Sequence, residues 1–168
     1  NENSNAIFIF DGNCTREFLD YVKKEASEKN FTKYFIPANF SKLAEFKNDV
    51  IFFRGFSLFI NLKEANILID SKKLSNAMDA SIAIFEKIRT ETSLTIVTDG
   101  PNIACGVSNE GVAKVQPEVI TGTASRLGAG DAFFAYFLSY KELNPSASLK
   151  KSLYAANRKT QNYLKAND

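Results

Sequence analysis

Two glycines and an aspartate form the segment of this sequence best suited to chemistry. Gly128-Ala129-Gly130-Asp131 precedes an apolar run of helical length, so the glycines allow a tight turn that leads into a helix. The first backbone N–H groups of a helix carry partial positive charge and favour a bound phosphate. Asp131 belongs to that first turn, where a carboxylate can accept the proton of a hydroxyl that attacks phosphorus. The plainer alternative is that Asp131 only complements the helix macrodipole.

A second polar pair, Asn61 and Glu64, has the spacing of a first helical turn. Its amide and carboxylate oxygens suit a magnesium ion that keeps several waters and bridges to nucleotide phosphates. The same pair fits a capping box, with Asn61 as the N-cap and Glu64 as the third helical residue. The two interpretations are compatible, and both stand as expectations.

Two further positions are candidates for a nucleotide site. Thr98-Asp99-Gly100 follows an apolar strand pattern and can supply a hydroxyl and backbone N–H groups, although it is also typical of a strand that runs into a turn. Asn157 is a polar position in the last helical pattern, where it is equally consistent with a surface residue.

The composition limits the classes of function. A chain of 168 residues suits one domain over residues 1–168. A net charge of +2 without a long basic block gives no electrostatic case for nucleic acid, and no apolar run reaches the length of a membrane span. The absence of histidine excludes a His base, and Cys14 and Cys105 are too few for a zinc site or a disulfide framework. These features favour a reduced, cytoplasmic protein.

The elements that must position these residues follow an alternating pattern. Short apolar runs alternate with helical periodicity, which predicts an α/β fold with a largely parallel sheet. Because ligands collect at the carboxyl ends of parallel strands, Asn61, Thr98 and the Gly128 turn are expected at one edge. Strands are predicted over residues 6–10, 32–36, 50–53, 56–60 and 94–97, with a hairpin over 103–107 and 112–119. Helices are predicted after Thr15, over 41–46, 75–90 and 128–140, and from a cap at 144–146 to 164, with Thr15, Ser41 and Ser75 as N-caps.

Taken in order, these motifs resemble the ribokinase-like (PfkB) family of sugar and nucleoside kinases. The resemblance rests on Asn61-x-x-Glu64, Thr98-x-Gly100 and Gly128-Ala129-Gly130-Asp131, and it extends from Ile7 to Leu164. It implies a three-layer α/β/α fold and ATP-dependent phosphotransfer to a sugar or nucleoside, without a nucleic-acid or membrane partner. Residues 8–13 and 35–42 look most like the pseudouridine-kinase branch, which favours a pseudouridine-like acceptor.

The resemblance also implies a role for each matching residue. Asp131 would be the base, and the backbone N–H groups of Gly128, Ala129 and Gly130 would stabilise the transferring phosphoryl group. The magnesium ion and its waters would be positioned by Asn61 and Glu64. The ATP site would be lined by Thr98, Gly100 and Asn157, with Asn157 near the adenine.

The sequence departs from the family pattern in two respects. Ser125 stands where the family usually has an acidic residue, which removes a contributor to a monovalent-cation site, and Arg126 adds a charge beside it. Family members also carry an N-terminal part that supplies the first strands, the lid and most sugar-binding residues. The chain is therefore expected to be the C-terminal portion alone, with an exposed sheet edge that a missing N-terminal part or a protein partner would cover.

Two functions follow from these expectations. The first is an ATP-dependent kinase whose remaining part lies elsewhere. The second is a truncated, catalytically inactive subunit that retains the fold for nucleotide binding or for a structural role.

Overall fold

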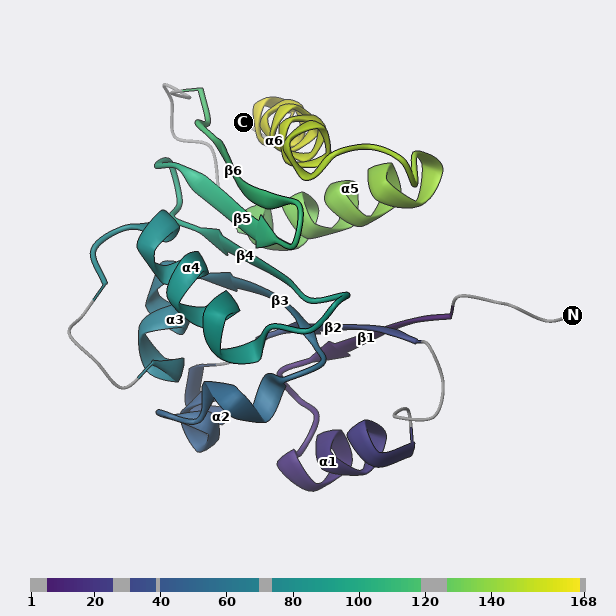
Figure 1. Cartoon of the computed structure of the whole chain (residues 1–168). Helices are drawn as coiled ribbons and strands as arrows, with labels where there is room; N and C mark the ends of the chain where they lie inside the picture. The colour runs from purple at the N-terminus through teal and green to yellow at the C-terminus, as the bar shows by residue number, and fades with distance from the viewer. Residues whose placement is uncertain (1–5, 26–30, 39, 70–73, 119–126, 167–168) are drawn as a thin grey trace, which may run out of the picture.

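The computed structural model describes residues 6–25, 31–38, 40–69, 74–118 and 127–166. In this part of the chain six strands form one sheet, whose spatial order β1-β2-β3-β4-β5-β6 is also the chain order (Figure 1). The first four strands are parallel, and the last two form an antiparallel hairpin, so the predicted largely parallel sheet is confirmed. Their bounds are β1 (Ile7–Asp11), β2 (Thr32–Ile36), β3 (Ser57–Asn61), β4 (Leu94–Thr98), β5 (Ala104–Ser108) and β6 (Gly111–Val115).

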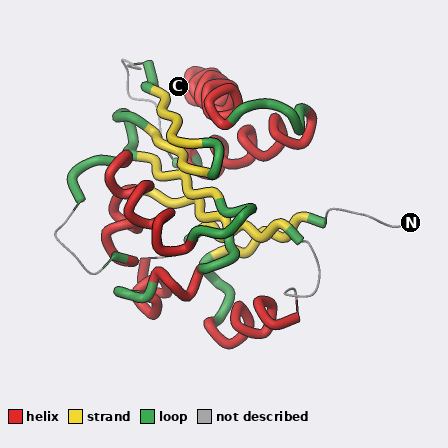
Figure 2. The backbone as a smooth tube through the Cα atoms, in the orientation of Figure 1, coloured by secondary structure: helices red, strands yellow, loops and turns green. Residues whose placement is uncertain are grey.

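Helices cover both faces of the sheet and make three layers (Figure 2). One face carries α1 (Arg16–Glu25), α2 (Phe40–Leu43), α3 (Leu62–Leu68) and α4 (Ala77–Ile88), with the short 3₁₀ turns η2 (Ala44–Phe46) and η3 (Val50–Phe53). The other face carries α5 (Ala129–Leu143) and α6 (Leu149–Ala166). No described helix is both long enough and apolar enough to cross a membrane.

Phenylalanines fill the space on both sides of the sheet. On the α1–α4 side, the ring of Phe53 lies 4.5 Å from that of Phe35 and 4.9 Å from that of Phe46. On the α5–α6 side, the Phe59 ring lies 5.7 Å from that of Phe133 and 5.1 Å from that of Phe134. Burial of each such ring stabilises the fold by roughly 2–3 kcal/mol, and these contacts fix the position of α5 over the middle strands.

Four local predictions were wrong, three of them between residues 40 and 76. Residues 50–53 form the 3₁₀ turn η3 rather than a strand, because Phe52 and Phe53 both turn into the same core and an extended chain would separate them. Asn76, not Ser75, is the N-cap of α4, and its Oδ1 accepts the Asp79 backbone N–H at 2.9 Å. Helix α2 begins at Phe40, so Ser41 lies inside it.

Other helix starts are explained by their caps. The Thr15 hydroxyl accepts the Phe18 backbone N–H at 3.2 Å, which confirms the predicted cap of α1. Residues 144–146 end α5 but do not cap α6, which begins only at Leu149.

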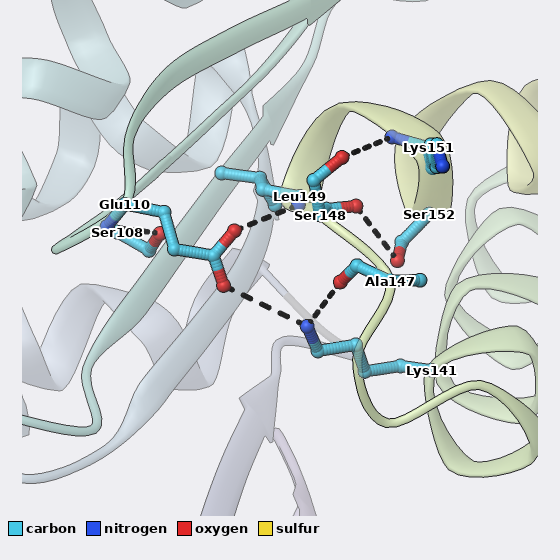
Figure 3. Close-up of polar contacts among 8 residues, drawn as sticks. All are labelled: Ser108, Glu110, Lys141, Ala147, Ser148, Leu149, Lys151 and Ser152. Carbon is cyan, nitrogen blue, oxygen red and sulfur yellow. Dashed lines mark hydrogen bonds and ion pairs between the residues drawn. The ribbon is translucent and has the colours of Figure 1, made fainter.

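The start of α6 is fixed to the turn between β5 and β6 (Figure 3). The Glu110 carboxylate accepts the Leu149 backbone N–H at 3.0 Å and lies 3.7 Å from the Lys141 ammonium group. Lys141 also donates to the Ala147 carbonyl at 2.6 Å. The hairpin therefore sets the direction in which α6 runs across the sheet.

Strand β1 ends the sheet in the described part of the chain. Two of its apolar side chains are open to solvent, with Phe8 41% and Ile9 50% exposed, whereas Phe10 is buried. This edge has the exposed character that the sequence predicts, and the described residues place no element over it.

Candidate active site

A cavity of about 590 Å³ opens at the carboxyl ends of β3 and β4, between the start of α5 and the second half of α6. It brings together residues that lie far apart in the sequence, as the strand-end argument predicts. Six of the nine predicted site residues line it: Asn61, Thr98, Gly100, Ala129, Gly130 and Asn157. The other three, Glu64, Gly128 and Asp131, do not line it.

The glycine-rich turn has the conformation that its sequence requires. Gly128 is the N-cap of α5 and has a φ of 75°, in the left-handed region that glycine tolerates best. Its carbonyl accepts the Ala132 backbone N–H at 2.8 Å, which closes the first turn. A Cβ atom on Gly130 would meet nothing within 4 Å, so the backbone there is open to the cavity. Asp131 is the third residue of α5 and is exposed.

Asn61 and Glu64 form the predicted capping box at the start of α3. The Asn61 side-chain oxygen accepts the Glu64 backbone N–H at 3.0 Å, and the Glu64 carboxylate accepts the Asn61 backbone N–H at 2.7 Å. Burial raises the pKa of Glu64 to about 7, against the lowering effect of its hydrogen bonds to Asn61, and the Asp131 carboxylate adds to the rise. Glu64 and Asp131 therefore belong to one electrostatic site, although they lie on helices from opposite layers.

The oxygen atoms at this place fit a magnesium ion that is held mainly by phosphates and water. The Asn61 N–H donates to one Glu64 oxygen, Oε2, and carboxylate oxygens have further acceptor capacity. No group of three or more His, Cys, Asp or Glu residues within the described ranges has a metal-binding arrangement. A closed protein cage is therefore not formed here, and Mg²⁺ does not require one.

The turn after β4 contributes backbone to the same cavity. Thr98 is the register partner of Asn61 across β3 and β4, so the two strand ends lie side by side. Gly100 has a φ of 55°, and a Cβ atom there would meet nothing within 4 Å. The turn is closed by Asp99, whose side chain accepts from the Asn102 amide at 2.9 Å.

The cavity wall formed by α6 is more polar than the sequence suggests. Asn157 is 7% exposed rather than a surface residue, and its amide donates to the Gln116 carbonyl at 3.4 Å. Sequence reasoning missed Thr160 and Gln161, which also line the cavity and are each 6% exposed. The available signal was their spacing, because positions 157, 160 and 161 continue the buried stripe of Leu153 and Ala156.

The expectation about a monovalent-cation site depends on residues that precede the glycine-rich turn. Ser125 and Arg126, on which it depends, lie outside the described residues.

Comparison with known proteins rests on structure alone, since no family model and no curated protein matches the sequence. Apo adenosine kinase from Trypanosoma brucei brucei matches 95% of this chain and 51% of its own, with a TM-score of 0.69 and 17% identity. A putative sugar kinase from Clostridium perfringens matches 95% of this chain and 48% of its own, with a TM-score of 0.73 and 17% identity. A mutant phosphofructokinase-2 from Escherichia coli matches 98% of this chain and 53% of its own, with a TM-score of 0.70 and 19% identity.

The chain has the ribokinase-like fold. The predicted α/β/α fold class is thereby confirmed. At this level of identity the likeness concerns the ribokinase-like fold only. The chain spans about half the length of the solved structures that it matches.

Proposed function

We propose that this chain carries the nucleotide site and the base of an ATP-dependent kinase that phosphorylates a hydroxyl of a sugar or nucleoside. The observation that carries the proposal is the first turn of α5, where open backbone at Ala129 and Gly130 lines the cavity and Asp131 follows directly. A helix N-terminus favours phosphate, and an adjacent carboxylate supplies the base that phosphoryl transfer to a hydroxyl needs. The ribokinase-like fold, shared with solved sugar and nucleoside kinases, supports the same class of reaction.

In the proposed reaction Asp131 takes the proton of the acceptor hydroxyl as that oxygen bonds to the γ-phosphorus of ATP. The bond from this phosphorus to the oxygen bridging to the β-phosphate breaks, and ADP leaves with that electron pair. The backbone N–H groups at the start of α5 stabilise the charge on the transferring phosphoryl group. Glu64 and Asn61 are the residues that would hold Mg²⁺ through its waters, and the bound ion would neutralise charge on the phosphates.

A pseudouridine-like acceptor is the finer part of the proposal. The segments that carry the resemblance to that branch lie together at the ends of β1 and β2. A Cβ atom on Gly12 would be 2.5 Å from the Ala38 backbone nitrogen, so the two turns touch. Lys42 donates to the Asn13 carbonyl at 3.1 Å, which ties α2 to the first turn. These contacts bring together the two segments that such an acceptor site would need.

The second candidate is a nucleotide-binding or structural subunit without catalytic activity, or one that acts only with a partner. The open edge at β1, where Phe8 and Ile9 are exposed, favours it. Transfer of labelled γ-phosphate from ATP to a panel of nucleosides and sugars separates the two. Phosphate transfer by the wild-type chain, together with its loss in the Asp131→Asn variant, supports the kinase. Thermal stabilisation by ATP without any transfer supports the subunit.

A further inference from the structure

A second cavity, of about 1040 Å³, lies along α5 and α6, which run side by side (Figure 1), and reaches β6. It is larger than the candidate active-site cavity of about 590 Å³ and shares no lining residue with it. On α6, Asn157 and Gln161 line the candidate active site, whereas Arg158 and Asn162, which directly follow them, line the second cavity. The proposed phosphotransfer therefore leaves this second cavity without a role.

Cationic side chains dominate the charge of the second cavity, and no carboxylate lines it. Five cations line it, one from β6 and four from α6: Lys114, Lys150, Lys151, Arg158 and Lys159. All five are exposed, and none forms an ion pair within the described part of the chain. Like charges held close together create a positive potential that attracts anions. The sequence contains no long basic block, so this concentration of charge arises from the fold.

Two acidic residues adjoin the lining, and both act on groups outside it. The Glu110 carboxylate accepts the Leu149 backbone N–H and pairs with Lys141 (Figure 3). Burial and the Glu142 carboxylate together raise the pKa of Tyr34, on β2, to about 12, so Glu142 acts toward the sheet. The positive charge of the cavity is therefore left for a ligand to neutralise.

The uncharged part of the lining supplies further hydrogen-bond donors. Hydroxyl groups come from three tyrosines and two serines, and the half-buried Tyr136 and Tyr140 lie one helical turn apart on α5. Ammonium and guanidinium groups only donate hydrogen bonds, and hydroxyl groups can also donate. A phosphate group offers several strong acceptor oxygens, and a guanidinium can bind two of them at once. The lining therefore fits phosphate groups.

The spacing of the cations indicates more than one phosphate. Lys150 and Lys151 lie eight residues before Arg158 and Lys159 on the same helix, which corresponds to about 12 Å along its axis. One phosphate group would leave part of this charge without a partner. The volume of the cavity is also that of sites for whole small molecules rather than for single ions.

We propose that the cavity along α5 and α6 binds a small anion that carries two or more phosphate groups. The phosphate oxygens accept hydrogen bonds from the lysine and arginine side chains of α6, and their charge reduces the repulsion among these cations. Inorganic polyphosphate and organic polyphosphate esters share this chemistry. The inference does not depend on the proposed kinase activity, because it concerns different residues.

Calorimetric titration of the purified chain with two probes tests the inference. Inorganic tripolyphosphate contains phosphate groups alone, whereas inositol hexakisphosphate carries its phosphates on a carbon ring. Each titration is made without ADP and again with excess ADP, which in the proposed function fills the other cavity.

The variants remove cavity cations in pairs. One carries Arg158→Gln with Lys159→Gln, and a second carries Lys150→Gln with Lys151→Gln. The matched control carries Lys47→Gln with Lys87→Gln, which removes the same charge from exposed positions that line neither cavity. Thermal melts of all the proteins report on folding, so a variant that fails to fold is recognised and the other pair decides.

The expected result is that the wild type and the control bind at least one probe in the presence of ADP. Each cavity variant weakens that binding by about ten-fold or more. Tighter binding of tripolyphosphate would indicate an inorganic ligand, and tighter binding of the inositol compound an organic one.

Three results overturn the inference: neither probe binds, ADP displaces the probe, or the cavity and control variants bind it equally. Tighter binding of a single-stranded oligonucleotide than of either probe would assign the surface to nucleic acid and also overturn it. A chain that does not bind ADP contradicts the proposed function, yet the comparison of variants without ADP still decides this inference.

Discussion

Besides burial, the Asp131 carboxylate, at the start of α5, raises the pKa of Glu64, at the start of α3, although the two helices belong to opposite layers of the fold. Burial raises the pKa of Glu64 to about 7, and repulsion by Asp131 adds to the rise. The two residues belong to the first turns of α3 and α5. A cation bound near the two carboxylates would reduce this repulsion.

The raised pKa of Glu64 predicts that the chain without nucleotide loses stability as the pH rises. The folded-state pKa of about 7 lies above the ordinary glutamate value of 4.5, so the folded state binds the proton more tightly. The folding stability that this proton contributes is complete below the unfolded-state pKa and is lost as the pH rises through the folded-state pKa. The Glu64→Gln variant keeps an acceptor for the Asn61 N–H and carries no charge. Near pH 8 it should therefore be more stable than the wild type, by at most about 3 kcal/mol.

Urea denaturation of both proteins near pH 5 and near pH 8 measures this difference. The two curves should nearly coincide at the lower pH, where Glu64 is mostly protonated in the folded state. An equal gap at both pH values would show that Glu64 is not the titrating group.

Asp131→Asn should remove phosphotransfer and leave nucleotide binding intact. Loss of a general base lowers the rate by about a hundred-fold to ten-thousand-fold. Because Asp131 is exposed, the fold should tolerate the change. The control is Asp79→Asn, since Asp79 is also the third residue of its helix and is exposed, but belongs to α4. The Asp79→Asn variant should retain transfer of labelled phosphate, and the Asp131→Asn variant should lose it. Equal loss of transfer in the two variants would show that the loss comes from weaker helix capping.

Substitution by alanine should have different effects on stability at Gly128, the N-cap of α5, and at Gly130, in the first turn of α5. Gly128→Ala forces a side chain into the left-handed region and should cost roughly 1–2 kcal/mol of folding stability. Gly130→Ala meets no protein atom and should leave stability unchanged or slightly higher. Its methyl group enters the cavity, so ADP binding should weaken. Melting temperatures and calorimetric titrations read the two effects separately, and normal ADP binding by Gly130→Ala would place the phosphates elsewhere.

The open edge at β1 should promote association in solution. Unpaired strand groups flanked by exposed apolar side chains favour pairing with another chain, and lysine on an edge strand opposes it. At high concentration the Ile9→Lys variant should therefore have a lower sedimentation coefficient than the wild type. Ile51→Lys is the matched control, because Ile51 is 60% exposed but lies in η3, away from the sheet edge. A wild type that remains monomeric at every concentration would contradict the expectation.

The parts of the fold that follow from local pattern could be predicted from the sequence. Strand β2 occupies the predicted residues 32–36, and the capping box at Asn61 and Glu64 follows from spacing alone. The 3₁₀ turn η3 could not be predicted, since a short apolar run has the same local pattern in a strand and in a buried turn. The packing of Phe52 and Phe53 against residues distant in sequence decides the outcome.

In the candidate site, too, some residues could be predicted from the sequence and others could not. Its motif residues are recognisable because turns and caps need particular residue types at particular spacings. The role of α6 depends instead on which face of that helix meets the cavity, and this follows from the packing of Leu149, Leu153 and Ala156 into the core on that side of the sheet. Asn157 therefore changes from a surface position to a buried one, and Gln161 becomes visible only in three dimensions.

The coincidence of spatial order and chain order in the sheet has a consequence for synthesis on the ribosome. Each strand pairs with the one made just before it, so pairing does not have to wait for later strands and can proceed as the chain emerges. The α6 wall of the cavity, residues 157–164, emerges after every strand of the described sheet. In the proposed kinase, nucleotide could therefore stabilise this part of the chain only after its six strands have been made.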